Sequence, residues 1–207
     1  MKILHIDSSI AGEDSISRQL SQEIVRSIRD AFWVEKVSYR DLIKDEIQQM
    51  NWDIAMGFRP DSGDIFFSEN VTKEHQFSDM LVNEFLASDV VVIGAPMYNF
   101  SVASQLKSWL DRIAQPGKTF RYTEHGPIGL VKDKKVIIAS CRGGFYKDLP
   151  LEDMDFQERY LESFFNFLGV KSVQYIRAEG MSRGAEIRQD QIDSAFSQIS
   201  LIIENLN

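Results

Sequence analysis

Short runs of apolar residues alternate with longer amphipathic stretches along most of this chain. The runs are rich in Val and Ile, as in Val90-Val-Val-Ile-Gly94, and predict strands that are buried on both faces. The stretches repeat apolar residues at helical spacing, as at Leu20, Ile24 and Ile28, and predict helices that pack on the strands by one face. We therefore expect strands at residues 2–8, 34–42, 90–94, 135–140 and 173–178, and helices at residues 17–32, 77–87, 101–114, 153–168 and 187–206. Ser101 is the expected N-cap of the third helix.

This regular alternation is typical of a parallel sheet that is covered by helices on both faces. Five strands with intervening helices fit the flavodoxin-like order 2-1-3-4-5, in which the chain reverses direction between its first and third strands. A length of 207 residues suits one domain with a core of adequate size. We therefore expect a single doubly wound α/β domain over residues 1–207.

Two segments depart from the alternation. Residues 43–76 are rich in polar and turn residues, including Arg59-Pro-Asp-Ser-Gly63. A structureless loop of that length is rare in a compact domain, so we expect it to contain a short helix and to serve a function such as covering a site. Residues 118–131 carry Gly126, Pro127 and Gly129 among aromatic residues, and predict a small hairpin inserted outside the main sheet.

Composition limits the classes of function. The net charge of −8 argues against a nucleic-acid partner, because no basic patch is dense enough to neutralise many phosphates. The single cysteine, Cys141, excludes a disulfide framework, and three scattered histidines argue against a metal site. No apolar run is long enough to span a membrane, and the chain enters a strand pattern at Lys2 with no room for a signal peptide. We expect a cytoplasmic protein with no metal, nucleic acid or membrane as partner.

Three loops with unusual chemistry follow predicted strands. In a sheet of this order, ligands bind beyond the carboxyl ends of the strands, near the point where the chain reverses. The loops after Ile6, Ile93 and Ala139 are therefore expected to meet at one edge of the sheet.

The first of these loops is rich in serine. The hydroxyl donors are Ser8, Ser9, Ser15 and Ser17. The amides at the start of the following helix add the positive end of its dipole, and this combination suits a phosphate group. Ser15 or Ser17 could equally serve only to cap the helix, so both interpretations stay open. Neither a Walker motif nor G-x-G-x-x-G is present, which argues against nucleoside triphosphate and ordinary dinucleotide sites.

The second and third loops suit a flat ring. After the third strand the chain offers apolar surface and backbone donors at Met97, Tyr98, Asn99 and Phe100. These large side chains could instead only cover the core. In the third loop, Gly143 and Gly144 let the backbone approach a ligand, although an ordinary turn would use glycine in the same way.

A phosphate joined to a flat heterocycle describes FMN, and three such loops at one edge favour a common ligand. A flavin needs amides near its pyrimidine edge to stabilise negative charge, which Asn99, Gly143 and Gly144 could supply. We expect no catalytic side chain, because the flavin N5 carries the hydride. The absence of a catalytic triad or carboxylate pair argues against a hydrolase.

The chain resembles the FMN-dependent NADH-azoreductase family, the flavodoxin-fold quinone and azo-dye reductases of bacteria. The resemblance runs from end to end and is most specific in the strings Pro96-Met-Tyr-Asn-Phe100 and Phe120-Arg-Tyr-Thr-Glu124. Further matching segments are Ser8-Ser9, Ser15-x-Ser17, Gln105-Leu-Lys107, Gly126-Pro127, Gly129-Leu130, Arg142-Gly-Gly144, Tyr160-Leu161, Phe167-x-Gly169 and Ala178-Glu-Gly180.

The resemblance implies one FMN per subunit and NADH as co-substrate. Two electrons would pass from NADH, by a ping-pong cycle, to quinones and to aromatic azo compounds, which are cleaved to amines. The residues that would bind FMN are Ser9, Ser15, Ile16, Ser17, Met97, Tyr98, Asn99, Phe100, Cys141, Arg142, Gly143 and Gly144.

The resemblance further implies a homodimer with its active sites at the interface. There Tyr122 and Phe167 would wall the substrate pocket, one or both facing the FMN of the other subunit. Phe164, Phe165, Phe167 and Leu168 give one helix apolar residues on more than one face, which independently favours burial against a partner. A wholly intramolecular core would produce the same pattern.

Three departures from the commoner family pattern are expected to shift substrate preference without removing activity. Cys141 replaces a serine, and a thiol is a weaker hydrogen-bond donor; His125 replaces an asparagine; Phe145-Tyr146 alters the rim of the pocket.

Two other functions stay open beside the reductase. One is a flavodoxin-like one-electron carrier without a substrate of its own, against which the aromatic hairpin at Phe120–Tyr122 argues. The other is a regulatory or scaffold protein without flavin.

Overall fold

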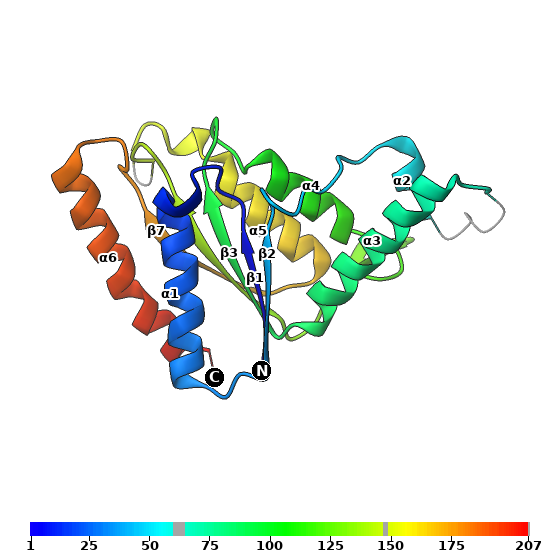
Figure 1. Cartoon of the computed structure of the whole chain (residues 1–207), viewed down its shortest axis with the longest axis horizontal. Coiled ribbons are helices and arrows are strands. Elements are labelled where there is room, and N and C mark those ends of the chain that lie inside the picture. Colours follow the sequence, from blue (N-terminus) through cyan, green and yellow to red (C-terminus); the bar gives the residue numbers. More distant parts are fainter. Residues whose placement is uncertain (60–64, 147–148, 207) are drawn as a thin grey trace.

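The main sheet has five parallel strands in the order β2-β1-β3-β6-β7, as predicted. The computed structural model describes residues 1–59, 65–146 and 149–206. Figure 1 shows the sheet between two layers of helices. The strands are β1 (Lys2–Asp7), β2 (Lys36–Asp41), β3 (Val90–Pro96), β6 (Lys135–Cys141) and β7 (Ser172–Ala178).

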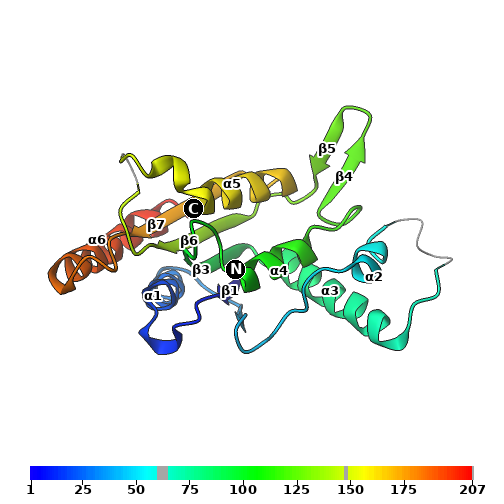
Figure 2. The same ribbon diagram turned by 90° about the horizontal axis from the view of Figure 1, so that it is seen from above.

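The helices divide between the two faces because successive side chains of a strand point to opposite sides. On β3, Val91 and Ile93 pack with the cluster formed by three helices, whereas Val90 and Val92 pack with that of the other two. The first group comprises α3 (Glu69–Ala87), α4 (Ser104–Ile113) and α5 (Phe156–Leu168), and the second comprises α1 (Ile16–Ala31) and α6 (Ala185–Glu204). Figure 2 shows the two groups on either side of the sheet.

Both segments that interrupt the alternation have the expected content. The polar stretch after β2 contains the short helix α2 (Trp52–Met56), whose first turn is capped by Asn51. Residues 60–64 of this stretch lie outside the described residues, and the role of the stretch as a cover stays a prediction. The antiparallel strands β4 (Phe120–Thr123) and β5 (Gly126–Gly129) form the predicted hairpin, which projects from the body of the molecule in Figure 2.

The prediction was wrong about the start of α3, which begins at Glu69 and not at residue 77. The turns from Glu69 to Glu74 have little apolar periodicity, so the hydrophobic pattern did not reveal them. Ser68 begins this helix by accepting a hydrogen bond from the Val71 amide at 3.4 Å.

Ser101 is not the N-cap that we expected. The helix α4 begins at Ser104, after Ala103, which has no capping side chain. Ser101 instead pairs its backbone with Tyr98 across a tight turn. The helix expected from residue 153 begins at Phe156, with Asp155 as its cap and a 3₁₀ turn (Glu152–Met154) before it. Within the described ranges, no helix is both long and apolar enough to cross a membrane.

Candidate functional site

The carboxyl ends of β1, β3, β6 and β7 surround a cavity of about 350 Å³. The loop from β1 into α1 forms one wall, and the loops after the other strands form the rest. Nine residues predicted to bind the cofactor line it: Ser9, Ser15, Ile16, Ser17, Met97, Tyr98, Cys141, Arg142 and Gly143. The three loops singled out in the sequence therefore do meet at one edge of the sheet.

Ser15 both caps a helix and lines the cavity. Its hydroxyl oxygen accepts a hydrogen bond from the Arg18 amide at 3.3 Å and lies 3.0 Å from the Ser17 hydroxyl. A hydroxyl that accepts from an amide keeps its own proton to donate. The amides of Ile16 and Ser17 open α1 and have no carbonyl within the helix to bond to. The capping role and an anion-binding role are thus compatible in this loop.

Ser8 differs from the other serines. Its side chain is fully buried, and its hydroxyl donates to the Gly94 carbonyl at 2.8 Å. This bond fixes the end of β1 to β3, so Ser8 belongs to the sheet and does not line the cavity.

Tyr98 ties the serine loop to the loop after β3. The Ile10 amide donates to its hydroxyl at 3.2 Å, and the Ser9 hydroxyl lies 3.4 Å from it. Tyr98 also lines a second cavity of about 540 Å³, together with Asn99, Gln105 and Tyr160. The two cavities therefore meet at one aromatic side chain.

Asn99 and Phe100 form a strained two-residue turn. Their φ angles are 47° and 71°, and the Tyr98 and Ser101 backbones exchange hydrogen bonds of 3.0 and 3.1 Å around them. Two positive φ angles suit Asn or Gly, and Phe is an uncommon residue in that conformation. Backbone strain of this kind persists where the surroundings enforce it, often at binding sites. Phe100 lines neither cavity, and its ring centroid lies 6.5 Å from that of Tyr146.

Arg142 is a buried cation surrounded by carboxylates. Its Nη2 lies 2.6 Å from Asp155 and 2.7 Å from Glu158, and Nη1 lies 3.6 Å from Glu179. Burial alone would raise the pKa of Glu158, but hydrogen bonds and charge from Arg177 and Arg142 lower the pKa overall. Arg142 therefore fastens its loop to α5 and the end of β7.

The remainder of that loop is closely packed. A Cβ on Gly143 would lie 2.9 Å from the Ser182 hydroxyl, so glycine permits this approach. Gly144 does not line the cavity. Burial raises the pKa of Cys141 to about 12, so its thiol is neutral near pH 7. The Cys141 carbonyl accepts a hydrogen bond from the Met97 amide at 2.8 Å, which joins the second loop to the third.

Tyr122 and Phe167 lie elsewhere in this chain. Both pack on Phe120, with ring centroids 5.3 and 4.6 Å away, and neither lines the cavity. Tyr122 on the projecting hairpin is 73% exposed. The structure therefore brings these two residues together, but away from the cavity at the edge of the sheet.

The sequence reasoning missed a fourth loop, after β7. Met181 and Ser182 from this loop and Arg188 from α6 line the cavity, as do Ala11 and Asp14 from the first loop. The sequence did carry a signal for this loop, because a glycine, Gly180, follows the last predicted strand. In the structure Gly180 has a φ of 70°, which favours glycine. Across the described ranges, no three His, Cys, Asp or Glu side chains form a group that could hold a metal ion.

Comparisons with known proteins agree with this geometry. A family model described as "Flavodoxin-like fold" matches residues 1–202. FMN-dependent NADH:quinone oxidoreductase 2 of Xanthomonas euvesicatoria is 48% identical over 206 residues, which cover 100% of this chain and 95% of that protein. FMN-dependent NADH:quinone oxidoreductase of Ralstonia nicotianae is 48% identical over 203 residues, with 98% and 97% covered. The chain belongs to this family.

Solved structures share the fold of this family member. Azoreductase from Bacillus anthracis superposes with a TM-score of 0.90 at 26% identity, over 99% of both chains. An FMN-dependent NADH-azoreductase from the same species, in complex with FMN, has a TM-score of 0.86 at 22% identity, over 98% of this chain and 99% of that one. Both the family resemblance and the fold predicted from the sequence are confirmed.

The donors present in the cavity fit the group that the family names specify. Three serines, the N-terminal amides of α1 and the Arg188 cation suit a phosphate, and among the described residues that line the cavity Asp14 is the one carboxylate. The adjoining cavity beside Tyr98 and Asn99 gives room for an aromatic ring system. Gly143 lets the third loop pack closely against Ser182 of the loop after β7, and both residues line the cavity.

Proposed function

We propose that this chain binds FMN in the cavity at the carboxyl edge of its sheet and reduces quinones and aromatic azo compounds at the expense of NADH. The observation that carries the proposal is the meeting of the serine loop, the Met97–Phe100 loop and the Cys141–Gly144 loop in a chain of this family. Two electrons are transferred in each half of the cycle.

Ser9, Ser15 and Ser17 and the amides that open α1 would hold the phosphate of the cofactor. Met97, Tyr98 and Asn99 would hold the ring from the cavity walls, and Phe100 would support them through the turn that it forms with Asn99. The backbone of the third loop at Cys141, Arg142 and Gly143 would bind the polar edge of the ring, with Gly144 next to them in the loop. The first loop would thus hold the phosphate end of the ligand and the second loop its ring, and Tyr98 joins these two loops.

FMN supplies two-electron transfer when it is bound, so the chain needs no catalytic acid or base of its own. The protein's task is to bind the cofactor, to orient donor and acceptor over one flat surface, and to exclude water. Tyr98 and Asn99 border the second cavity, where an aromatic donor or acceptor would stack. Because NADH and the acceptor would both use this second cavity, a ping-pong cycle is favoured, in which NADH leaves before the acceptor enters.

The active form is proposed to be a homodimer with one FMN per subunit. Tyr122 and Phe167 do not line the cavity of their own chain, and the exposure of Tyr122 on a projecting hairpin is consistent with contact across an interface. A cytoplasmic location is part of the proposal, since a free thiol such as Cys141 stays reduced there.

Anaerobic absorption spectroscopy tests this function. Addition of NADH to the yellow holoprotein is expected to bleach the flavin bands, and addition of a benzoquinone or an azo dye is expected to restore them. NADPH in place of NADH measures the preference for the donor. A flavin that stays oxidised in NADH contradicts the proposal. A one-electron carrier would need a protein partner for turnover, so steady-state reduction of the benzoquinone by the protein alone separates the two functions.

A further inference from the structure

Arg18 stands at a position where a cation is ordinarily unfavourable. It is the third residue of α1, close to the positive end of the helix dipole, and the first turn of this helix holds no acidic residue. Its side chain is nevertheless only 6% exposed. A buried cation in the first turn of a helix destabilises the fold unless other groups compensate for it, which points to a specific role.

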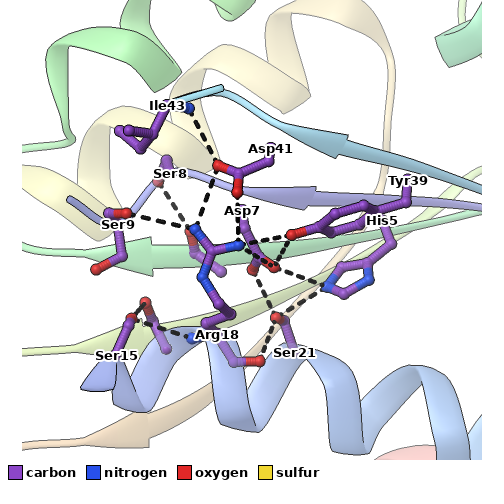
Figure 3. Close-up of polar contacts among 12 residues, drawn as sticks. His5, Asp7, Ser8, Ser9, Ser15, Arg18, Ser21, Tyr39, Asp41 and Ile43 are labelled. Carbon is purple, nitrogen blue, oxygen red and sulfur yellow. Dashed lines mark hydrogen bonds and ion pairs between the residues drawn. The ribbon is translucent and has the colours of Figure 1, made fainter. Parts of the chain in front are cut away.

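The compensation comes from both neighbouring strands, as Figure 3 shows. The guanidinium donates two hydrogen bonds to the Asp41 carboxylate, at 3.0 and 3.2 Å, and one to the Tyr39 hydroxyl at 2.6 Å. The Asp7 carboxylate lies 3.5 Å from Nη1 of Arg18, the nitrogen that also donates to Tyr39. Burial would raise the pKa of Asp41, but the hydrogen bonds from Arg18 and from the Ile43 amide lower it, so Asp41 stays ionised.

Asp7 is held in turn by neutral donors. The Ser21 hydroxyl donates to it at 2.7 Å and the Tyr39 hydroxyl at 3.1 Å. Burial and the charge of Asp7 raise the pKa of Tyr39, which therefore remains a donor. The result is a fixed polar cluster that joins β1, β2 and α1 beneath the serine loop.

Arg18 contacts both ends of the serine loop. Its Nη2 donates to the Ser9 carbonyl at 3.5 Å, and its amide donates to the Ser15 hydroxyl at 3.3 Å. In the described part of the chain, Ser9 and Ser15 line the cavity and Arg18 does not. The guanidinium thus holds the Ser9 end of the loop against the first turn of α1, while the amide of the same residue fixes Ser15.

We infer that Arg18 is a positioning residue for the phosphate of the cofactor. Anchored by Asp41, Asp7 and Tyr39, it sets the spacing between the Ser9 end of the loop and the first turn of α1, where the phosphate donors stand. This inference rests on the proposed function. It predicts a defect confined to the phosphate end of the ligand, which a general loss of stability would not produce.

Riboflavin provides the discriminating probe, because it has the ring of FMN without the phosphate. The dissociation constants of FMN and riboflavin are measured on the full-length apoprotein by quenching of flavin fluorescence. Arg18→Lys keeps the positive charge but loses the planar guanidinium that donates two hydrogen bonds to Asp41. For this variant we expect FMN affinity to fall about tenfold to a hundredfold. Riboflavin affinity is expected to stay unchanged.

Asp41→Asn separates positioning from charge and serves if Arg18→Lys does not fold. It removes a negative charge near the phosphate and also removes the anchor of Arg18. A positioning role predicts that FMN affinity falls relative to riboflavin. A purely electrostatic role predicts that it rises, and that result would overturn the inference.

Arg112→Lys is the matched control. Arg112 is equally buried, pairs with Glu74 from another helix, and lies away from the cavity. The inference holds if the ratio of the two affinities changes in the Arg18 and Asp41 variants and not in this control. It is overturned if the ratio stays constant in Arg18→Lys, or shifts equally in Arg112→Lys. A wild-type apoprotein that binds neither flavin would instead refute the proposed function.

Discussion

Several residues at this site stabilise the fold and also present groups that can contact a ligand. Ser15 caps α1 with its oxygen and keeps a proton to donate, and Tyr98 accepts the Ile10 amide while bordering both cavities. Arg142 lines the cavity, but its guanidinium forms ion pairs with Asp155 and Glu158. Its contribution to cofactor binding is therefore to hold the shape of its loop.

Cys141 allows a prediction about reactivity. With its pKa raised from 9.0 to about 12 by burial, the thiolate fraction at pH 8 falls from about one in ten to about one in ten thousand. We expect an aromatic disulfide reagent to label the native protein roughly a thousandfold more slowly than the protein unfolded in guanidinium chloride, followed by absorbance. Rapid labelling of the native protein at pH 8 would contradict the burial of this thiol.

The sequence revealed those site residues whose role depends on local context. Ser15 and Ser17 precede an amphipathic stretch, and Met97 to Phe100 follow a buried strand, so their positions at the sheet edge could be predicted. Arg18 could not be recognised in this way, because its partners Asp41 and Tyr39 belong to β2, which follows α1 in the sequence by a separate pattern. Only the three-dimensional structure brings such groups together.

Elements place the site through their ends. The cap residue Asp155 accepts hydrogen bonds from the Gln157 and Glu158 amides and also contacts Arg142, so the start of α5 is fixed to the third loop. The Arg177 guanidinium extends this connection to β7 through three hydrogen bonds to Glu158. The network holds one side of the cavity by charge.

The pH dependence of stability should report this network. Because the pKa of Glu158 lies below its ordinary value of 4.5 in the folded chain, its contribution is present above that pH and is lost as the pH falls through the folded pKa. We expect Glu158→Gln to lower the free energy of unfolding by about 3 kcal/mol at pH 7, with the difference shrinking below pH 4.5. Urea unfolding between pH 3 and 7 measures it. The exposed Glu162 on the same helix gives the control Glu162→Gln, and equal losses in both variants would contradict the assignment.

Element types were easier to predict than element starts. Buried Val and Ile runs identified the strands of the main sheet, but the first turns of α3 carry polar residues that leave no periodic signal. At α4, a tight turn with two positive φ angles takes Ser101 out of the helix, and tertiary contacts hold that turn. The backbone of Phe100 accepts the Phe156 amide at 3.1 Å, which anchors the turn to α5.

At the scale of the whole molecule, the parallel sheet brings loops that are far apart in sequence to one edge. The hairpin β4–β5 is the part of the fold that this arrangement does not explain. It projects from the body (Figure 2). Tyr122 and Ile128 on this hairpin are exposed. An exposed apolar hairpin is more readily explained by a partner than by water.

We therefore expect the protein to sediment as a homodimer. Tyr122→Ala should lower kcat/KM for a benzoquinone by about tenfold, the equivalent of a lost aromatic contact, without changing FMN affinity. Arg121, the preceding residue of the same strand, faces the opposite side, and Arg121→Ala is the control. A monomer with full activity, or equal effects of the two substitutions, would contradict the proposed interface.

The most direct test of the central claim is a crystal structure of the protein with FMN. The account predicts that the phosphate lies within hydrogen-bond distance of Ser15, Ser17 and the first amides of α1, with the ring against Met97 to Phe100. A flavin bound at another surface, or a carboxyl-edge cavity closed by the protein's own side chains, would contradict it.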